Sequence, residues 1–334
     1  MIRTIVVAFA GLGIATRIDA HHSQSAFDLA EEIEVAGVVT AYEWANPHVY
    51  ITIASSADNG DIETWEIEAN GISMMRRRGW TADMFAVGDR ISVTGNPGKA
   101  PASRSILLAE IQRADGTVLE YVAGQFSEPA DDIQPASRLN GIWVAEGAGT
   151  AWQVFTRSAA MPLTEAGRTA LAGYVESRDS NAIDCIPFSL PMLMLLPDIK
   201  SFELDERRLV IRSELDATVR TIQLGENAPA DMPPADLGHS VGRWDGEALV
   251  VTTSGFTAHS QGLGPGLPAS EDKRVSERFA INPDRTSFTY TVSVDDPRYL
   301  EAPIGGEMIY RYRPDLEFLP AECNLDSARR FLNY

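Results

Sequence analysis

Two stretches of alternating apolar and polar side chains decide the fold: EVAGVVTAYEW at residues 34–44 and VYITIAS at residues 49–55. An alternation with a period of two residues is typical of strands that bury one face. It continues after Asn-Gly and Gly-Asn-Pro-Gly turn signals, in runs at residues 63–69, 90–94 and 105–112. Residues 71–85, between the third and fourth runs, predict a short helix. Five strands with a helix after the third predict an OB-like barrel in a domain at residues 21–120.

A second, larger β-rich domain is predicted at residues 141–334, after a linker at 121–140 in which Pro, Asp and Ser gather without periodicity. Turn signals such as Asp245-Gly246 predict an antiparallel meander that closes into a barrel. Its strands are expected within residues 201–215 (with a turn at Asp205-Glu206), 218–224, 238–244, 248–254, 274–281, 287–294 and 306–312. A helix is predicted at 163–177 with Thr164 as its N-cap. Residues 262–266 (GLGPG) are expected to form a flexible loop, and the fold class is mainly all-β.

The first twenty residues, MIRTIVVAFAGLGIATRIDA, predict a signal peptide, because Arg3 precedes an apolar stretch that is too short to span a bilayer. Cleavage is expected after Ala20, with Ala15 as the alternative. No later segment has the length of a membrane span, so we expect a periplasmic or secreted protein without an integral membrane segment. In such a compartment Cys185 and Cys323 are expected to form a disulfide.

The charge of the chain excludes several classes of partner. The sequence holds 47 acidic and 28 basic side chains, a net charge of −19. Nucleic-acid binders need clustered Lys and Arg to displace counterions, and anionic lipid attracts basic surfaces. Within residues 33–113 acidic side chains also outnumber basic ones, so the OB-like barrel is not expected to bind nucleic acid. The sequence has neither a Gly-x-Ser-x-Gly elbow nor a His-Glu-x-x-His helix, the motifs of common hydrolases and zinc proteases.

Histidines near the N-terminus predict a metal site. Cleavage after Ala20 leaves a chain that begins His21-His22-Ser23. A terminal histidine offers its α-amine and ring Nδ1 as a chelate, and His48 could add a second imidazole, with His22 as a possible third. Three nitrogens in this arrangement suit Cu(II). The alternative is that His21-His22 is a solvated leader and that His48 is a capped turn residue.

Four short motifs occur together in the first domain, namely His21-His22-Ser23, Phe27-Asp28, Glu43–His48 (EWANPH) and Arg77–Trp80 (RRGW). In this combination the segment from His21 to about Arg113 resembles the N-terminal domain of a family of uncharacterised exported bacterial proteins. The resemblance implies no activity, but it implies that the His-His start and the Asn-Pro-His belong to one module. The terminal histidine is also similar in principle to the copper braces of lytic polysaccharide monooxygenases and periplasmic copper carriers.

Residues 140–334 resemble a domain that accompanies this module in some members. The matching elements are Cys185-Ile186-Pro187, Arg220-Thr221-Ile222, Gly242–Gly246 (GRWDG), Glu277-Arg278-Phe279 and Cys323. Relatives are expected to carry a histidine after the final cysteine, where this chain has Asn324. This difference puts histidine-based chemistry in the second domain in doubt.

Weaker candidates for a site lie on or beside the strands of the second domain. His239, Arg220 and Glu277 could line a barrel interior and bind a small acidic or polar ligand. The competing interpretation is that Glu277 and Arg278 form a solvated pair, and His259 is expected at the surface. In the first domain, Glu66 and Glu68 share one strand face.

Three functions follow from these residues. The first is an exported metal-binding protein, with copper as the ion, in copper handling or a copper-dependent redox step. The second is a periplasmic module without metal that binds a small ligand or a partner protein through the C-terminal barrel. The third is a cofactor-free lyase or isomerase in that barrel. The sequence leaves open whether the protein is an enzyme.

Overall fold

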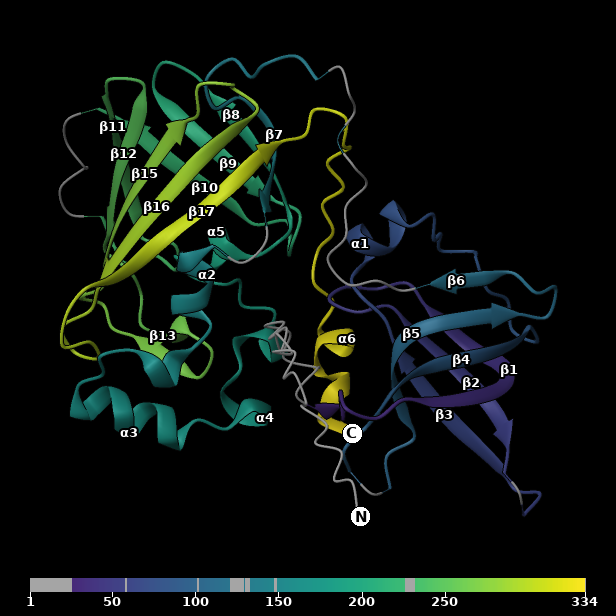
Figure 1. The fold of residues 1–334 in the computed structure, drawn as a ribbon. Coiled ribbons are helices and arrows are strands. Elements are labelled where there is room, and N and C mark those ends of the chain that lie inside the picture. Colours follow the sequence, from purple (N-terminus) through teal and green to yellow (C-terminus); the bar gives the residue numbers. More distant parts are fainter. Residues whose placement is uncertain are drawn as a thin grey trace, which may run out of the picture.

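The chain forms two β-barrels, with a C-terminal segment between them (Figure 1). The computed structural model describes residues 26–57, 59–100, 102–120, 129, 133–146, 149–225 and 232–333. The predicted signal peptide, His21 and His22 lie outside the described residues. The domain boundaries expected from the sequence remain predictions, although β6 ends at Glu120 and β7 begins at Gly141.

The first barrel is closed by five strands in the OB-like order that the alternation predicted. The sheet runs β3-β2-β1-β4-β5-β6, and a parallel pairing of β3 with β5 closes it. Apolar side chains such as Ile51, Ile53 and Val93 fill its interior. The strands are β1 (Ile33–Glu43), β2 (Tyr50–Ser56), β3 (Ile62–Glu68), β4 (Arg90–Pro97), β5 (Ser105–Arg113) and β6 (Val118–Glu120).

The helix after the third strand, α1, spans only Ile72–Arg77, whereas residues 71–85 were expected to be helical. It stops because Gly79 adopts a left-handed φ of 77° and the buried Trp80 turns the chain back to the core. At its start, Asn46 Oδ1 accepts the Ile72 N–H at 2.8 Å. A side chain from another loop therefore satisfies one of the unpaired donors of the first turn.

The second barrel is closed by nine strands of the described chain, in the order β10-β11-β12-β15-β16-β17-β7-β8-β9. All neighbouring pairs are antiparallel except β10 and β11, which are parallel, so the expected antiparallel meander is wrong at this point. The chain leaves β10 at Leu224 and returns in the same direction at His239. The strands are β7 (Gly141–Glu146), β8 (Ile199–Leu204), β9 (Arg208–Ser213), β10 (Val219–Leu224), β11 (His239–Asp245), β12 (Ala248–Ser254), β15 (Arg274–Ile281), β16 (Ser287–Asp295) and β17 (Ile304–Tyr312).

Short helices gather at one end of this barrel (Figure 1). All four residues of α5 (Met192–Leu195) are buried, and the Tyr310 hydroxyl donates to the Met194 carbonyl. The single helix expected at 163–177 is two helices, α3 (Glu165–Gly173) and α4 (Glu176–Asp179), and Thr164 caps the first through Gly167 N–H at 3.1 Å. The remaining helices near this barrel are α2 (Thr150–Phe155), η2 (Ser158–Ala160) and η3 (Asn181–Asp184).

The glycine-rich stretch 262–266 is not the expected flexible loop. It belongs to a small hairpin of β13 (His259–Gly264) and β14 (Leu267–Ala269), and most of its side chains are buried. A Cβ at Gly264 would lie 2.5 Å from the Phe155 carbonyl oxygen. Glycine is therefore needed here for close packing, which the sequence alone did not distinguish from flexibility.

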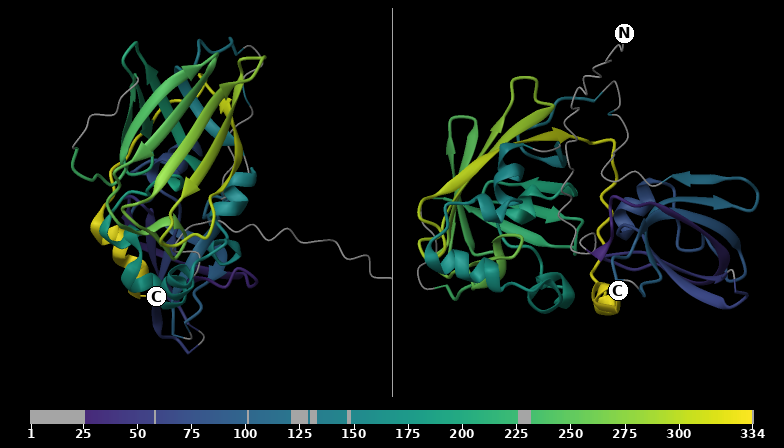
Figure 2. Two further views of the ribbon diagram at one scale, coloured as in Figure 1. Left: turned by 90° about the vertical axis from the view of Figure 1, so that its left-hand side faces the viewer. Right: turned by 60° about the horizontal axis from the view of Figure 1, so that its bottom comes forward.

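The C-terminal segment carries α6 (Leu325–Arg329) and η4 (Arg330–Asn333), and α6 lies between the barrels in Figure 1 and in the right-hand view of Figure 2. The predicted disulfide is confirmed, since Cys323 in this segment is bonded to Cys185 after η3. Arg330 pairs with Glu43 of the first barrel at 2.7 Å. The segment is thus fastened to both barrels.

Candidate functional site

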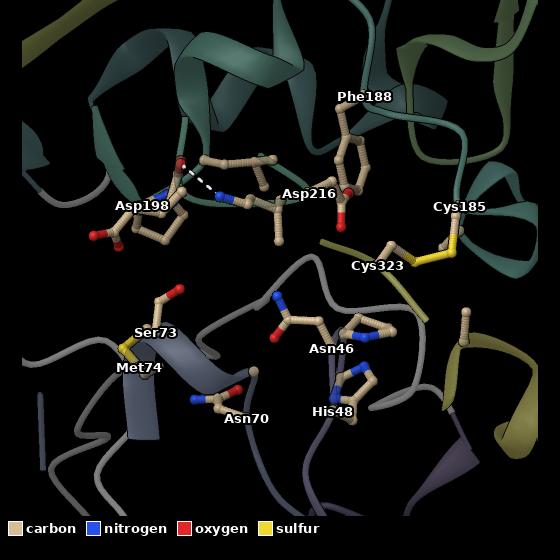
Figure 3. A pocket seen from close by; sticks show the side chains of 18 of the residues that line it. Asn46, His48, Asn70, Ser73, Met74, Cys185, Phe188, Asp198, Asp216 and Cys323 are labelled. Carbon is tan, nitrogen blue, oxygen red and sulfur yellow. Dashed lines mark hydrogen bonds between the residues drawn. A yellow bond between two sulfur atoms is a disulfide. The ribbon is translucent and has the colours of Figure 1, made fainter. Parts of the chain in front are cut away.

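A cavity of about 140 Å³ lies where the two barrels meet the C-terminal segment (Figure 3). Its walls come from three parts of the chain that are far apart in sequence. The first barrel contributes residues 46–48, 70, 71, 73, 74 and 77, the second barrel contributes residues 182, 185, 186, 188, 196–198 and 214–216, and the C-terminal segment contributes Cys323 and Ala328.

The imidazole of His48 forms part of the wall on the first barrel. Its Nδ1 lies 3.1 Å from the Ala69 carbonyl oxygen and 3.3 Å from Oε1 of the fully buried Glu68. Because both neighbours are acceptors, the hydrogen of the neutral ring belongs on Nδ1. The lone pair of Nε2 is then available, and no hydrogen bond from the described residues reaches it. Nε2 is therefore the ring nitrogen through which His48 can bind a further group.

The loop that carries His48 is fixed by the C-terminal segment. Asn46, which is buried, donates from Nδ2 to the Ala321 carbonyl at 2.9 Å, and its Oδ1 holds the start of α1. The Ser327 hydroxyl of α6 donates to the His48 carbonyl at 2.9 Å. The position of the ring is therefore set by contacts with both the first barrel and the C-terminal segment.

Asp216 occupies the opposite wall, in the turn between β9 and β10 (Figure 3). Asp216 and Ala217 have left-handed φ angles of 53° and 49°, the pattern of a tight hairpin turn. Oδ1 of Asp216 is buried and has no hydrogen-bond partner within the described part of the chain. Burial, and secondarily the charge of Asp198, raise the pKa of Asp216 to about 6, against a smaller lowering by His48.

The other charged groups of the cavity wall are paired. Arg77 is hydrogen-bonded to Glu214, which also accepts the Leu319 N–H at 2.6 Å. Burial raises the pKa of Glu214, and Arg77 opposes this effect. Asp198 accepts hydrogen bonds from Lys200 and Ser213.

Arg220 and Glu277 lie inside the second barrel and are bound to each other. Tyr290 donates to Glu277 at 2.8 Å, and Arg220 also bonds to the Ser240 and Thr253 hydroxyls. The expectation of a solvated Glu277–Arg278 pair is therefore wrong. Adjacent residues of a strand point to opposite faces, and Arg278 bonds to Asp245 on the outside at 2.7 Å.

The two histidines of the second domain do not join this buried cluster. Ser240 points inward to Arg220, so His239 lies on the other face of β11, where Nε2 contacts the Pro233 carbonyl at 2.7 Å. His259 was expected at the surface but is buried. Its Nδ1 accepts the Gln261 N–H at 3.2 Å and its Nε2 lies 3.1 Å from the Pro187 carbonyl. Burial lowers the pKa of His259, which fits a neutral ring that holds the chain together.

Among the described residues, no group of three or more His, Cys, Asp and Glu side chains could hold a metal ion. The expected ligands His21 and His22 lie outside that part of the chain, so their approach to His48 stays a prediction. Across the same described ranges, no helix has the length and apolar character needed to cross a membrane.

Asp216 was missed by reasoning from the sequence, and the role of Glu68 beside His48 was not predicted. The only sequence signal for Glu68 is its place on a strand that ends next to the Asn-Gly turn at residues 70–71. Asp216 follows Leu215 in a turn, and nothing in the neighbouring sequence distinguishes it from the acidic residues of other turns. Its importance comes from burial, which depends on the packing of the other barrel.

Comparison with known proteins shows that the first barrel is similar to proteins of unknown function. Residues 10–106 match a protein family described as a family of unknown function (DUF6152). The match includes His21, His22, His48 and Glu68, and it ends before the second barrel. No curated protein matches the chain. The first barrel, with its candidate histidines, is thus similar to an uncharacterised family, in agreement with the resemblance carried by its short motifs.

Proposed function

We propose that the protein is exported, is processed after Ala20, and binds a copper ion through His48 and its new N-terminal histidine. The observation that supports this function is the setting of His48, whose Nδ1 faces the Ala69 carbonyl and the Glu68 carboxylate while Nε2 is left available. Histidine ligands of metal ions commonly donate their other ring N–H to a carbonyl or carboxylate, which fixes the ring and strengthens the ligand.

His21 would supply the α-amine and ring Nδ1, and His48 the third nitrogen, with His22 as a possible further ligand. An α-amine titrates near pH 7.7 and an unperturbed imidazole near pH 6.5, so such a site loads at neutral pH. A copper ion held by three nitrogens keeps an open position, which suits copper handling or a copper-dependent redox step. The match at residues 10–106 supports the proposal because one module contains all of these histidines.

Export is part of the same proposal, since only cleavage of the leader exposes the amine of His21. The disulfide between Cys185 and Cys323 supports an oxidising compartment, the periplasm or the extracellular space.

The test is a Cu(II) titration of the processed, metal-free protein against a competing chelator, after N-terminal sequencing. We expect a chain that begins at His21 and binds one Cu(II) with an electron paramagnetic resonance spectrum of nitrogen ligands. His21→Ala and His48→Ala should each weaken binding at least about tenfold, and Glu68→Gln by about 10- to 100-fold. A glycine inserted before His21 should also weaken binding, because it moves the amine and keeps the imidazole.

His239→Ala is the matched control, because His239 contacts a backbone carbonyl on the second barrel. It should bind copper like the native chain. The proposal fails if the His21→Ala, His48→Ala double variant binds copper as tightly as the native protein, or if the processed chain begins at Thr16.

A metal-free ligand-binding function is the second candidate, and the cavity between the barrels favours it. This cavity lies outside the C-terminal barrel in which a ligand was expected. The third candidate, a lyase or isomerase, gains no support, because His239 lies on the opposite face of the barrel wall from Arg220 and Glu277.

A further inference from the structure

The cavity between the barrels combines an apolar wall with polar groups at one side. The apolar wall is formed by Ile186, Phe188 and Leu215 of the second barrel and by the disulfide, and Met74 faces it from the first barrel. Figure 3 shows Phe188 and Asp216 next to each other on one wall, with Asn46 and His48 on the other. A ligand in this cavity would contact apolar carbon on most sides.

The charges of the wall leave one carboxylate without compensation. Arg77 neutralises Glu214, and Lys200 neutralises Asp198. Among the described residues Asp216 forms no ion pair with a Lys or Arg side chain, and its Oδ1 is both buried and without a hydrogen bond. His48, on the facing wall, has the smallest of the three effects on the pKa of Asp216. A buried carboxylate in this state is unfavourable unless something supplies a donor or a positive charge.

We propose that this cavity binds a small organic cation, with its ammonium group against Asp216 and its apolar body against Phe188 and Leu215. The ammonium group supplies the positive charge that this carboxylate lacks. An anion is disfavoured because Asp216 and Asp198 lie close enough for their charges to interact.

The size of the cavity limits the ligand. An apolar cavity of about 150 Å³ accommodates benzene, and the cavity described here has about 140 Å³. The apolar body should therefore hold about six non-hydrogen atoms. Cyclohexylamine meets this limit, and its ammonium group, like that of lysine, titrates near pH 10 and is charged at neutral pH.

The experiment is a titration of the metal-free protein with cyclohexylamine, cyclohexanol and cyclohexanecarboxylate, followed by the methyl signals of labelled methionines. Met74 lines the cavity, whereas Met232 is exposed and away from it. We expect cyclohexylamine to shift the Met74 signal and leave the Met232 signal in place. Cyclohexanol should bind about 10- to 100-fold more weakly, and the carboxylate should not bind at the same concentrations.

Asp216→Asn should weaken cyclohexylamine binding by the same 10- to 100-fold and leave cyclohexanol unchanged. Glu206→Gln, which removes an exposed carboxylate from the turn between β8 and β9, is the control for net charge and should bind like the native chain. Equal affinity for the amine and the alcohol, or an Asp216→Asn variant that binds the amine as tightly as the native chain, would overturn the proposal. Since metal is absent throughout, this outcome is independent of copper binding.

Discussion

Asp216 combines a left-handed backbone with a buried carboxylate oxygen that has no hydrogen-bond partner in the described chain, and both features cost folding stability. Burial also raises its pKa to about 6. Such features reduce stability and persist where the surrounding structure enforces them, often at functional sites. The residue therefore offers a direct test of whether the cavity is built around a charge.

The folded state holds a proton on Asp216 more tightly than the unfolded state, whose pKa is near 3.9. The stability that comes from protonated Asp216 is therefore fully present below about pH 4 and is lost as the pH rises through 6. Asp216→Asn should remove this loss and raise the free energy of unfolding at pH 7.5 by at most about 3 kcal/mol. Urea denaturation of the metal-free protein at pH 4.5 and pH 7.5 measures the effect.

Asp205→Asn is the control with the opposite sign. Backbone N–H groups of Arg207 and Arg208 lower the pKa of Asp205, so its stabilising effect is present above about pH 4 and lost below it. If Asp216→Asn does not gain stability relative to the native chain as the pH rises, the buried charge assigned to Asp216 is incorrect.

The loop before β2, which carries Asn46 and His48, is hydrogen-bonded to both α1 and the C-terminal segment. Asn46 receives the Ile72 N–H of α1 and donates to the Ala321 carbonyl. One amide side chain thus joins a helix start to a segment about 275 residues away. These two hydrogen bonds fix the loop that places His48 in the cavity wall.

Asn46→Ala should lower the free energy of unfolding by about 2 kcal/mol, because a helix donor and a backbone acceptor both lose their partner. Asn46→Asp keeps the acceptor for Ile72 and should lose less. Ser73→Ala, which removes a single hydrogen bond to the Leu319 carbonyl, is the comparison in the same denaturation series. An Asn46→Ala variant that is no less stable than Ser73→Ala would contradict this role of Asn46.

In the whole molecule, the C-terminal segment joins two barrels that have separate hydrophobic cores. The disulfide closes a loop of 138 residues between Cys185 and Cys323 and holds the segment to the second barrel. A cross-link over such a distance mainly reduces the entropy of the unfolded chain.

The Cys185→Ser, Cys323→Ser double variant should lose about 3–5 kcal/mol of unfolding free energy. The native protein denatured in the presence of dithiothreitol should show the same loss, which controls for the serines themselves. An unchanged urea midpoint in both samples would show that the loop closure contributes nothing.

Period-2 alternation predicted most strands of both barrels, because each strand buries one face, but it did not indicate β6 or β7. It did not find β13 and β14, since Gly262 and Gly264 leave no side chain to alternate, and it did not show that β10 and β11 are parallel. Thr164 was predicted because helix capping depends on neighbouring residues, and the disulfide was predicted because an oxidising compartment favours the pairing of two cysteines. The metal ligands proposed from the sequence are untested, since His21 and His22 lie outside the described residues.

The cavity itself could not be predicted from the sequence. Its walls combine His48, Asp216 and Cys323, and no local pattern tells which of these segments will meet. The burial of Asp216 depends on a barrel whose strands begin far upstream. Long-range packing of this kind is visible only in the folded chain.

The position of the C-terminal segment between the barrels has a consequence for biosynthesis. A ribosome produces the first barrel, with His48, long before it produces Cys323 and Ser327. The hydrogen bonds from the C-terminal segment to the loop of His48 can therefore form only after nearly all of this sequence has been synthesised. A chain cut short by a nonsense codon could fold its first barrel and still lack a finished cavity.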